Sequence, residues 1–130
     1  MIEQFVYDAI SQDETLQALL SAGSDGIHLY PSSVPTGIEA EAMVTFTLIG
    51  TRDRYPEIEA RSVQFSIFTK THTGGATIAA ALASIFNDDN RRTEDGVKVV
   101  KSMRESESDL GYDYDDKYYQ REATYGFIMR

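Results

Sequence analysis

The residue types that carry most enzyme chemistry are scarce in this sequence. Its 130 residues include no cysteine and only two histidines, His28 and His72. Without cysteine there are no disulfides, thiolate metal sites or cysteine nucleophiles. Neither histidine belongs to a pair spaced four residues apart on a helix, the spacing that binds zinc, and no Gly-x-Ser-x-Gly motif presents a serine nucleophile. The sequence therefore predicts a protein that is not an enzyme, with no cofactor and no metal centre.

Two segments nevertheless have the composition of ligand-binding loops. Residues 71–75, Thr-His-Thr-Gly-Gly, precede a helical pattern but lack the lysine of a phosphate-binding loop, so we interpret them as an ordinary helix start with Thr73 as N-cap. Residues 105–116 hold six carboxylates and could attract Ca²⁺. An EF-hand register beginning at Asp113 puts Tyr118 where glycine is needed and Thr124 where glutamate is needed, which favours a solvated loop over a cation site.

Two groups of residues are better suited to protein contacts. Tyr114 and Tyr118 lie in the acidic tract, and exposed tyrosine is favoured at interfaces because it offers a large contact area with few rotors. Arg52, Arg54 and Tyr55 lie in a charged segment within an otherwise acidic half of the chain. Their guanidinium groups are candidates for contact with a neighbour's carboxylates, the alternative being a solvated hairpin end.

The charge balance argues against a nucleic-acid ligand. The chain has 21 acidic and 12 basic side chains and a formal net charge of −9, and residues 1–60 hold ten acidic side chains against two basic ones. Phosphate contacts are normally made by Lys and Arg, so we expect no DNA or RNA binding. The longest apolar run, residues 76–83, is far shorter than the roughly 20 residues that cross a bilayer, and the N-terminus does not have the pattern of a signal peptide.

Apolar periodicity and turn residues predict one α+β domain over residues 1–130. Its sheet is expected to be mainly antiparallel, with about four to five strands and two main helices packed on one face. A capping-box pattern at Ser11 and Glu14 predicts the start of a short second helix. The expected helices cover 2–10, a segment after Ser11, and 76–86; the expected strands cover 27–30, 42–49, 62–69, 97–105 and 120–130; and two arms are expected at about 50–60 and 105–119.

This layout resembles the tail terminator, or tail-to-head joining, family of long-tailed bacteriophages. The resemblance covers nearly the whole chain and is carried by Asp13-Glu14-Thr15-Leu16-Gln17-Ala18-Leu19-Leu20, Gly26-Ile27-His28-Leu29-Tyr30-Pro31, the strand 43–49 leading into Gly50-Thr51-Arg52-Asp53, the strand 61–69, the alanine-rich helix 76–86 and the closing Tyr125-Gly126-Phe127-Ile128-Met129-Arg130. It implies a structural virion protein, made in the host cytoplasm, that forms a ring, commonly a hexamer. The ring caps the tail tube at its head-proximal end and joins the tail to the head.

The implied partners are further copies of the chain, the tail tube protein and a head-completion or connector protein, while DNA passes through without specific binding. A compact chain of this length has a radius of gyration of about 14 Å, so only several copies together could encircle a duplex. We expect Glu39, Glu41, Glu57 and Glu59 to face the channel, where like charge repels DNA. Arg52, Arg54 and Tyr55, and less strongly Tyr114 and Tyr118, are expected to contact the tube or a neighbouring subunit.

Two other functions remain open at the level of sequence. A head-completion stopper or another minor tail protein would share the size and ring geometry. An acidic protein could also mimic DNA to inhibit a nucleic-acid enzyme, although twelve cations dilute the 21 carboxylates well below the charge density of a duplex.

Overall fold

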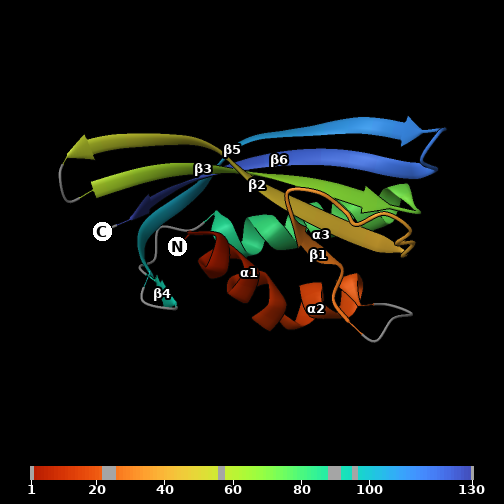
Figure 1. The fold of residues 1–130 in the computed structure, drawn as a ribbon, viewed down its shortest axis with the longest axis horizontal. Helices are drawn as coiled ribbons and strands as arrows, with labels where there is room; N and C mark the ends of the chain where they lie inside the picture. The colour runs from red at the N-terminus through yellow and green to blue at the C-terminus, as the bar shows by residue number, and fades with distance from the viewer. Residues whose placement is uncertain (1, 22–25, 56–57, 88–91, 95–96, 130) are drawn as a thin grey trace.

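Three helices lie on one side of a long, twisted sheet (Figure 1). The computed structural model describes residues 2–21, 26–55, 58–87, 92–94 and 97–129, with only the backbone described for 51–55, 58–59, 92–94, 97–98 and 100. The predicted α+β class and the mainly antiparallel sheet are confirmed, although the sheet has six strands instead of four or five. The short strand expected at 27–30 is present at Leu29–Pro31, and the strand at Arg92–Glu94 was not expected because it has only three residues.

The strands are arranged in the order β1-β2-β3-β6-β5-β4. Only the short β1 is parallel to its neighbour, and every other pair is antiparallel. Along the chain the elements are α1 (Ile2–Gln12), α2 (Glu14–Leu20), β1 (Leu29–Pro31), β2 (Ala42–Tyr55), β3 (Ile58–Thr69), α3 (His72–Phe86), β4 (Arg92–Glu94), β5 (Val97–Asp113) and β6 (Tyr118–Met129).

The alternating apolar residues of the sequence form the face of the sheet that the helices cover. Successive side chains of a strand point to opposite faces, so residues two apart share a face. On the covered face of the three central strands these residues are almost fully buried: Val44 and Phe46 in β2, Val63, Phe65 and Ile67 in β3, and Ala123, Tyr125 and Phe127 in β6. The opposite face carries mainly polar side chains and no helix (Figure 1).

An aromatic cluster fixes α3 to the covered face. The ring of Phe86 stacks on Phe65 at 5.6 Å between centroids and meets Phe127 edge-on at 5.4 Å and Tyr125 at 5.9 Å. All four side chains are at most 1% exposed. Burial raises the pKa of Tyr125 to about 12, so its hydroxyl stays neutral at ordinary pH.

Both predicted helix caps are wrong by two residues. The N-cap of α2 is Asp13, whose carboxylate accepts from the Leu16 amide at 3.0 Å, and the Ser11 hydroxyl instead donates to the Asp8 carbonyl. The N-cap of α3 is Thr71, whose hydroxyl accepts from the Gly74 amide at 3.0 Å. Each N-cap residue has an extended backbone and a side-chain oxygen that accepts from an amide of the first turn, and in both cases the residue predicted as the cap lies two positions away.

The predicted arms are the ends of two long hairpins. Strands β2 and β3 continue through most of 50–60, to Tyr55 and from Ile58, and β5 continues to Asp113. The solvated loop expected at 105–116 is therefore wrong up to Asp113, because pairing with β6 holds these polar residues in a strand. The two hairpins turn at opposite ends of the sheet: the β2–β3 end lies beside the last residues of β6, and the β5–β6 turn lies beside the start of α3 (Figure 1).

We expect Phe86→Ala to destabilise the protein by about 3–5 kcal/mol, because it removes the ring that joins α3 to β3 and β6 and leaves a cavity. The measurement is the free energy of unfolding from urea denaturation. Leu110→Ala is the control, since Leu110 is 52% exposed and its loss should cost no more than about 0.5 kcal/mol. Similar losses in the two variants would contradict the assignment of Phe86 to the core.

Candidate functional site

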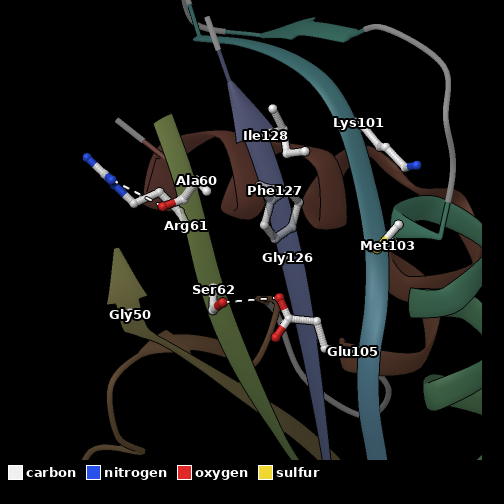
Figure 2. A pocket seen from close by; sticks show the side chains of 10 residues that line it. All are labelled: Gly50, Ala60, Arg61, Ser62, Lys101, Met103, Glu105, Gly126, Phe127 and Ile128. Carbon is white, nitrogen blue, oxygen red and sulfur yellow. Dashed lines mark hydrogen bonds between the residues drawn. The ribbon is translucent and has the colours of Figure 1, made fainter. Parts of the chain in front are cut away.

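The open face of the sheet has a hollow at its β2–β3 end, which we call the basic groove. Figure 2 looks onto this face, with the helices behind the sheet. The groove has a volume of about 560 Å³ and is lined by Gly50, Ala60, Arg61, Ser62, Lys101, Met103, Glu105, Gly126, Phe127 and Ile128. Arg61 and Lys101 border it on opposite sides and point away from each other, with the Glu105 carboxylate between them (Figure 2), and the Arg61 guanidinium donates to the Ala60 carbonyl at 3.3 Å.

Glu105 shapes the floor of the basic groove by reaching across a neighbouring strand. Its side chain extends from β5 over β6, and its carboxylate accepts a hydrogen bond from the Ser62 hydroxyl of β3 at 3.2 Å (Figure 2). A β-carbon at Gly126 would overlap this carboxylate. Glycine at this position of β6 therefore lets one side chain connect three strands on the open face.

The turn between β5 and β6, which we call the acidic tip, consists of residues 112–117 and lies at the other end of the sheet. It carries Asp113, Asp115 and Asp116 against one cation, Lys117. The Asp113 carboxylate accepts from the amides of Asp115 at 2.9 Å and Asp116 at 3.2 Å, which shapes the turn. The tip thus presents three carboxylates on a defined backbone.

A row of aromatic rings runs from the acidic tip to α3. Tyr114 is 84% exposed and meets Tyr112 edge-on at 5.0 Å; Tyr112 meets Tyr119 at 4.9 Å, and Tyr119 meets the His72 ring at 5.7 Å. The expectation that Tyr114 is exposed in this tract therefore agrees with its position. Tyr112 and Leu110 are also exposed large side chains, and such residues on a charged hairpin are typical of a protein contact.

Tyr118 has a different role from the one expected. It is only 8% exposed, its hydroxyl donates to the Ala40 carbonyl at 3.0 Å and accepts from the Ala40 amide at 3.2 Å, and the Lys70 ammonium lies 5.1 Å from its ring centroid. The ring therefore attaches the segment before β2 to the hairpin. A buried ring of this kind is not available as a primary contact for another protein.

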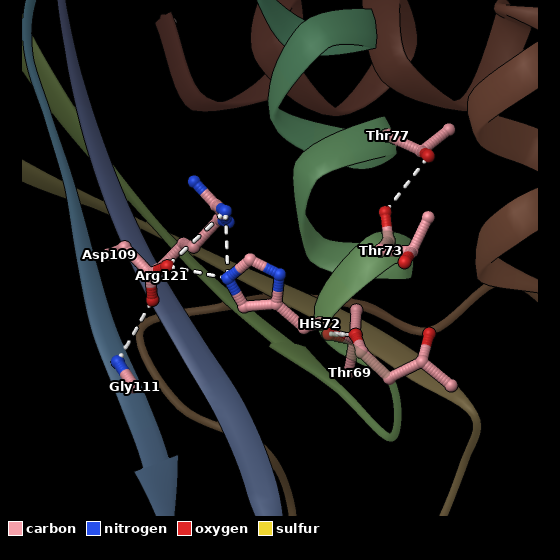
Figure 3. A network of polar contacts seen from close by, with 8 residues as sticks. Thr69, His72, Thr73, Thr77, Asp109, Gly111 and Arg121 are labelled. Carbon is pink, nitrogen blue, oxygen red and sulfur yellow. Dashed lines mark hydrogen bonds and ion pairs between the residues drawn. The ribbon is translucent and has the colours of Figure 1, made fainter.

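A network of polar contacts holds the hairpin to the first turn of α3 (Figure 3). The Asp109 carboxylate lies 2.7 Å from His72 Nε2 and 3.4 Å from Arg121 Nη2, and its other oxygen accepts from the Gly111 amide at 2.9 Å. The hydrogen bond with His72 and that from Gly111, together with the charge of Arg121, hold the pKa of Asp109 below its usual value. No sequence signal predicted this network, because its three side chains come from different elements.

The predicted basic contact residues lie at the opposite end from the acidic tip. Arg52, Arg54 and Tyr55 occupy the last part of β2, where Arg52 pairs with Ala60, and their side chains lie outside the described residues. The groove residues Arg61 and Lys101 were missed by sequence reasoning. Only the sheet register brings them to the same end.

Of the four glutamates expected to face a channel, three belong to the described part of the chain, and they lie at two ends of the sheet. Glu39 and Glu41 are exposed near the acidic tip, where the Glu41 carbonyl accepts from the Lys70 amide. Glu59 pairs with Met129 at the far end of β3, about 33 Å away at the usual rise per strand residue, and Glu57 lies outside the described residues. Within one chain, the pair Glu39 and Glu41 is therefore separated from Glu59 along the sheet, and the expectation that these residues face a channel stays a prediction.

Two further searches of the described residues gave negative results. No group of three or more His, Asp or Glu side chains there is arranged to hold a metal ion. No helix there is long and apolar enough to span a membrane.

Comparison with known proteins finds similarity among solved structures. No family model matches the chain, and no curated protein matches its sequence. Among solved structures, a chain of the virion of a native gene transfer agent particle matches with a TM-score of 0.70 and 17% sequence identity, over 95% of this chain and 90% of that chain. At this identity, the similarity shows that the two chains share a fold.

We expect Asp109→Asn to lower stability near neutral pH, because it removes the charge paired with His72 and Arg121. A carboxyl whose pKa is lowered by folding contributes stability above its unfolded value, 3.8, and loses it as the pH falls through the lower folded value. The urea midpoints of wild type and variant should therefore differ near neutral pH and converge below pH 3.8. Asp115→Asn, an exposed carboxylate on the same hairpin, is the control; a difference that persists unchanged in acid would contradict this account.

Proposed function

We propose that this chain is a structural virion protein that forms a ring capping the tail tube and joining the tail to the head. The observation that carries the proposal is the fold shared, over nearly the full length of both chains, with a component of the gene transfer agent virion. The order of sequence elements, which resembles the tail terminator family, supports the more specific position at the head-proximal end of the tail.

The shape of the sheet is suited to contacts on two sides. A ring forms when a surface at one end of a subunit binds a different surface at the other end of the next, and the rotation closes. The hairpins of this chain project at opposite ends of its sheet (Figure 1) and differ in sequence. Such a subunit has distinct surfaces for a neighbour on each side, and the tube and connector would contact the remaining rim.

The outer edges of β2 and β5 extend beyond their partners. Strand β5 pairs with β4 only through Val97, Lys98 and Val99, and register shifts interrupt its ladder with β6 at three places. Irregularities and charged residues at an edge discourage unspecific strand pairing. We therefore expect assembly to use the hairpin ends more than simple edge-to-edge pairing.

The net charge of −9 supports passage of DNA through such a ring. A basic channel would bind the phosphate backbone tightly, whereas like charge repels it. This expectation concerns the assembled ring as a whole.

The experiment that tests the function is deletion of the coding sequence in the particle-producing host, followed by electron microscopy. We expect filled heads separated from tails, with tails of abnormal length, and restoration by the wild-type chain in trans. Filled heads that leak DNA beside tails of normal length would instead indicate the head-completion alternative. Intact, infectious particles in the deletion strain would contradict both.

A second test concerns the predicted basic contact. Arg52→Glu combined with Arg54→Glu should reduce the number of joined particles by about tenfold or more, because it places like charges against the carboxylates of the neighbouring protein. The matched control is the double replacement by lysine, which keeps both charges and should retain most joining. Normal numbers of joined particles with the glutamate variant would remove these arginines from the contact.

A further inference from the structure

We infer that a cavity beside the acidic tip binds a linear aliphatic polyamine, a chain of methylene groups that carries two or more ammonium groups. The cavity, which we call the tip pocket, lies between the segment 32–39, the strands β2 and β3, and the turn after β5. Its volume of about 860 Å³ is within the range of about 300–1,000 Å³ that is usual for small-molecule sites. This inference concerns the chain by itself and does not rest on the proposed ring.

Three parts of the chain build the tip pocket. Its floor consists of Met43 and Thr45 in β2 with Ser66 and Phe68 in β3, which alternate with residues of the covered face and therefore point to the open face. The segment 32–39, between β1 and β2, forms one wall, and the β5–β6 turn at the same end of the sheet forms the other (Figure 1). A bound molecule would thus contact the sheet and both walls.

Hydrogen bonds hold the first wall in place on both sides of the cavity. The Ser32 amide donates to the Phe46 carbonyl of β2 at 3.0 Å. At the other end of the wall, the Tyr118 hydroxyl both donates to the Ala40 carbonyl and accepts from the Ala40 amide. A preformed cavity of this kind loses little conformational entropy when a ligand enters it.

The charged side chains that line the tip pocket are all carboxylates. Glu39 comes from the first wall, and Asp115 and Asp116 come from the second. None of these carboxylates makes an ion pair or a side-chain hydrogen bond with any residue that the structure describes. Lys70 and Lys117 are close in the sequence to lining residues, but neither lines the cavity. The pocket therefore favours a cationic ligand.

A buried hydroxyl without a partner faces the pocket from its floor. Thr45 is only 5% exposed, and within the described part of the chain its hydroxyl makes no hydrogen bond. Ser66, which pairs with Thr45 across the strands, also lines the floor. Leaving a buried polar group unpaired is costly. An ammonium group in the pocket would donate to such a hydroxyl oxygen, so the floor as well as the walls is suited to this ligand.

The apolar part of the pocket favours an aliphatic cation over a metal ion. Met43 and Phe68 in the floor and Ile38 in the wall provide surface for methylene groups, while the carboxylates lie on two separate walls. A ligand that matches both features has ammonium groups separated by an apolar chain. The protein already contains one contact of this type, since the Lys70 ammonium lies 5.1 Å from the ring centroid of Tyr118.

Calorimetric titration of spermidine into the purified chain tests the inference. We expect saturable binding to a single class of site. Asp115→Asn combined with Asp116→Asn should weaken this binding about tenfold, because two carboxylates of the pocket are lost. The matched control is Glu14→Gln with Glu107→Gln, which changes the net charge equally at exposed positions outside the pocket and should leave the affinity unchanged.

Two further variants keep the charge and change the interior of the pocket. Ser66→Phe places a ring over the floor and should abolish binding. Thr45→Val keeps the shape of the side chain but removes its hydroxyl, so it should weaken binding about threefold without lowering the stability of the free chain. Urea denaturation checks that both variants are folded, and Thr45→Val alone decides if Ser66→Phe does not fold.

Two other solutes distinguish a polyamine site from simple charge attraction. Mg²⁺ at the same concentration as spermidine should not displace it, and octanediol, a chain without ammonium groups, should not bind. The inference is overturned by absence of spermidine binding, equal weakening in the two double carboxylate variants, unchanged affinity in the folded interior variants, displacement by Mg²⁺, or binding of octanediol. These measurements do not involve the ring, so their failure would leave the proposed function as it stands.

Discussion

The strands of this sheet are much longer than the helices that cover them. This difference in length determines which parts of the sheet surface stay exposed. Strand β5 has 17 residues, about 56 Å in extended form, whereas α3 has 15 residues and is about 22 Å long. The helices can therefore bury only the middle of one face. The aromatic cluster around Phe86 occupies that middle, and both hairpin ends extend beyond it.

A hairpin that extends beyond its core needs other interactions to hold it in place. At the β5–β6 end these are polar: Tyr118 bonds to the backbone of Ala40, and Asp109 connects the hairpin to His72 at the start of α3. Glu105 makes a similar connection across three strands on the open face. Surface ion pairs of this type contribute little to global stability. Their main effect here is to give an exposed strand end one orientation.

The sequence predicted the buried half of this fold well and the exposed half poorly, for one physical reason. Alternating apolar residues such as Val63, Phe65 and Ile67 indicate locally that one face of a strand is buried. The central strands and the helix ending at Phe86 could therefore be recognised from sequence. The polar residues of β5 beyond position 105 have no such apolar pattern. They form a strand because β6 pairs with them, and that pairing is a long-range interaction that composition does not encode.

The same reason limits what could be predicted of the site. Tyr114 and Tyr118 look alike in the sequence, yet one is exposed and the other is buried by a segment 78 residues away along the chain. Arg61 and Lys101 became part of one groove only through the strand order. Candidate contact residues can thus be chosen from sequence by type, but their grouping into surfaces requires the register.

The gathering of carboxylates at the acidic tip has a consequence for specificity. Asp113, Asp115 and Asp116 face one cation there, so two acidic tips repel each other and dimers built on two tips are disfavoured. A net charge of −9 adds a general repulsion between copies. Two copies therefore associate only where specific contacts between different surfaces outweigh this repulsion.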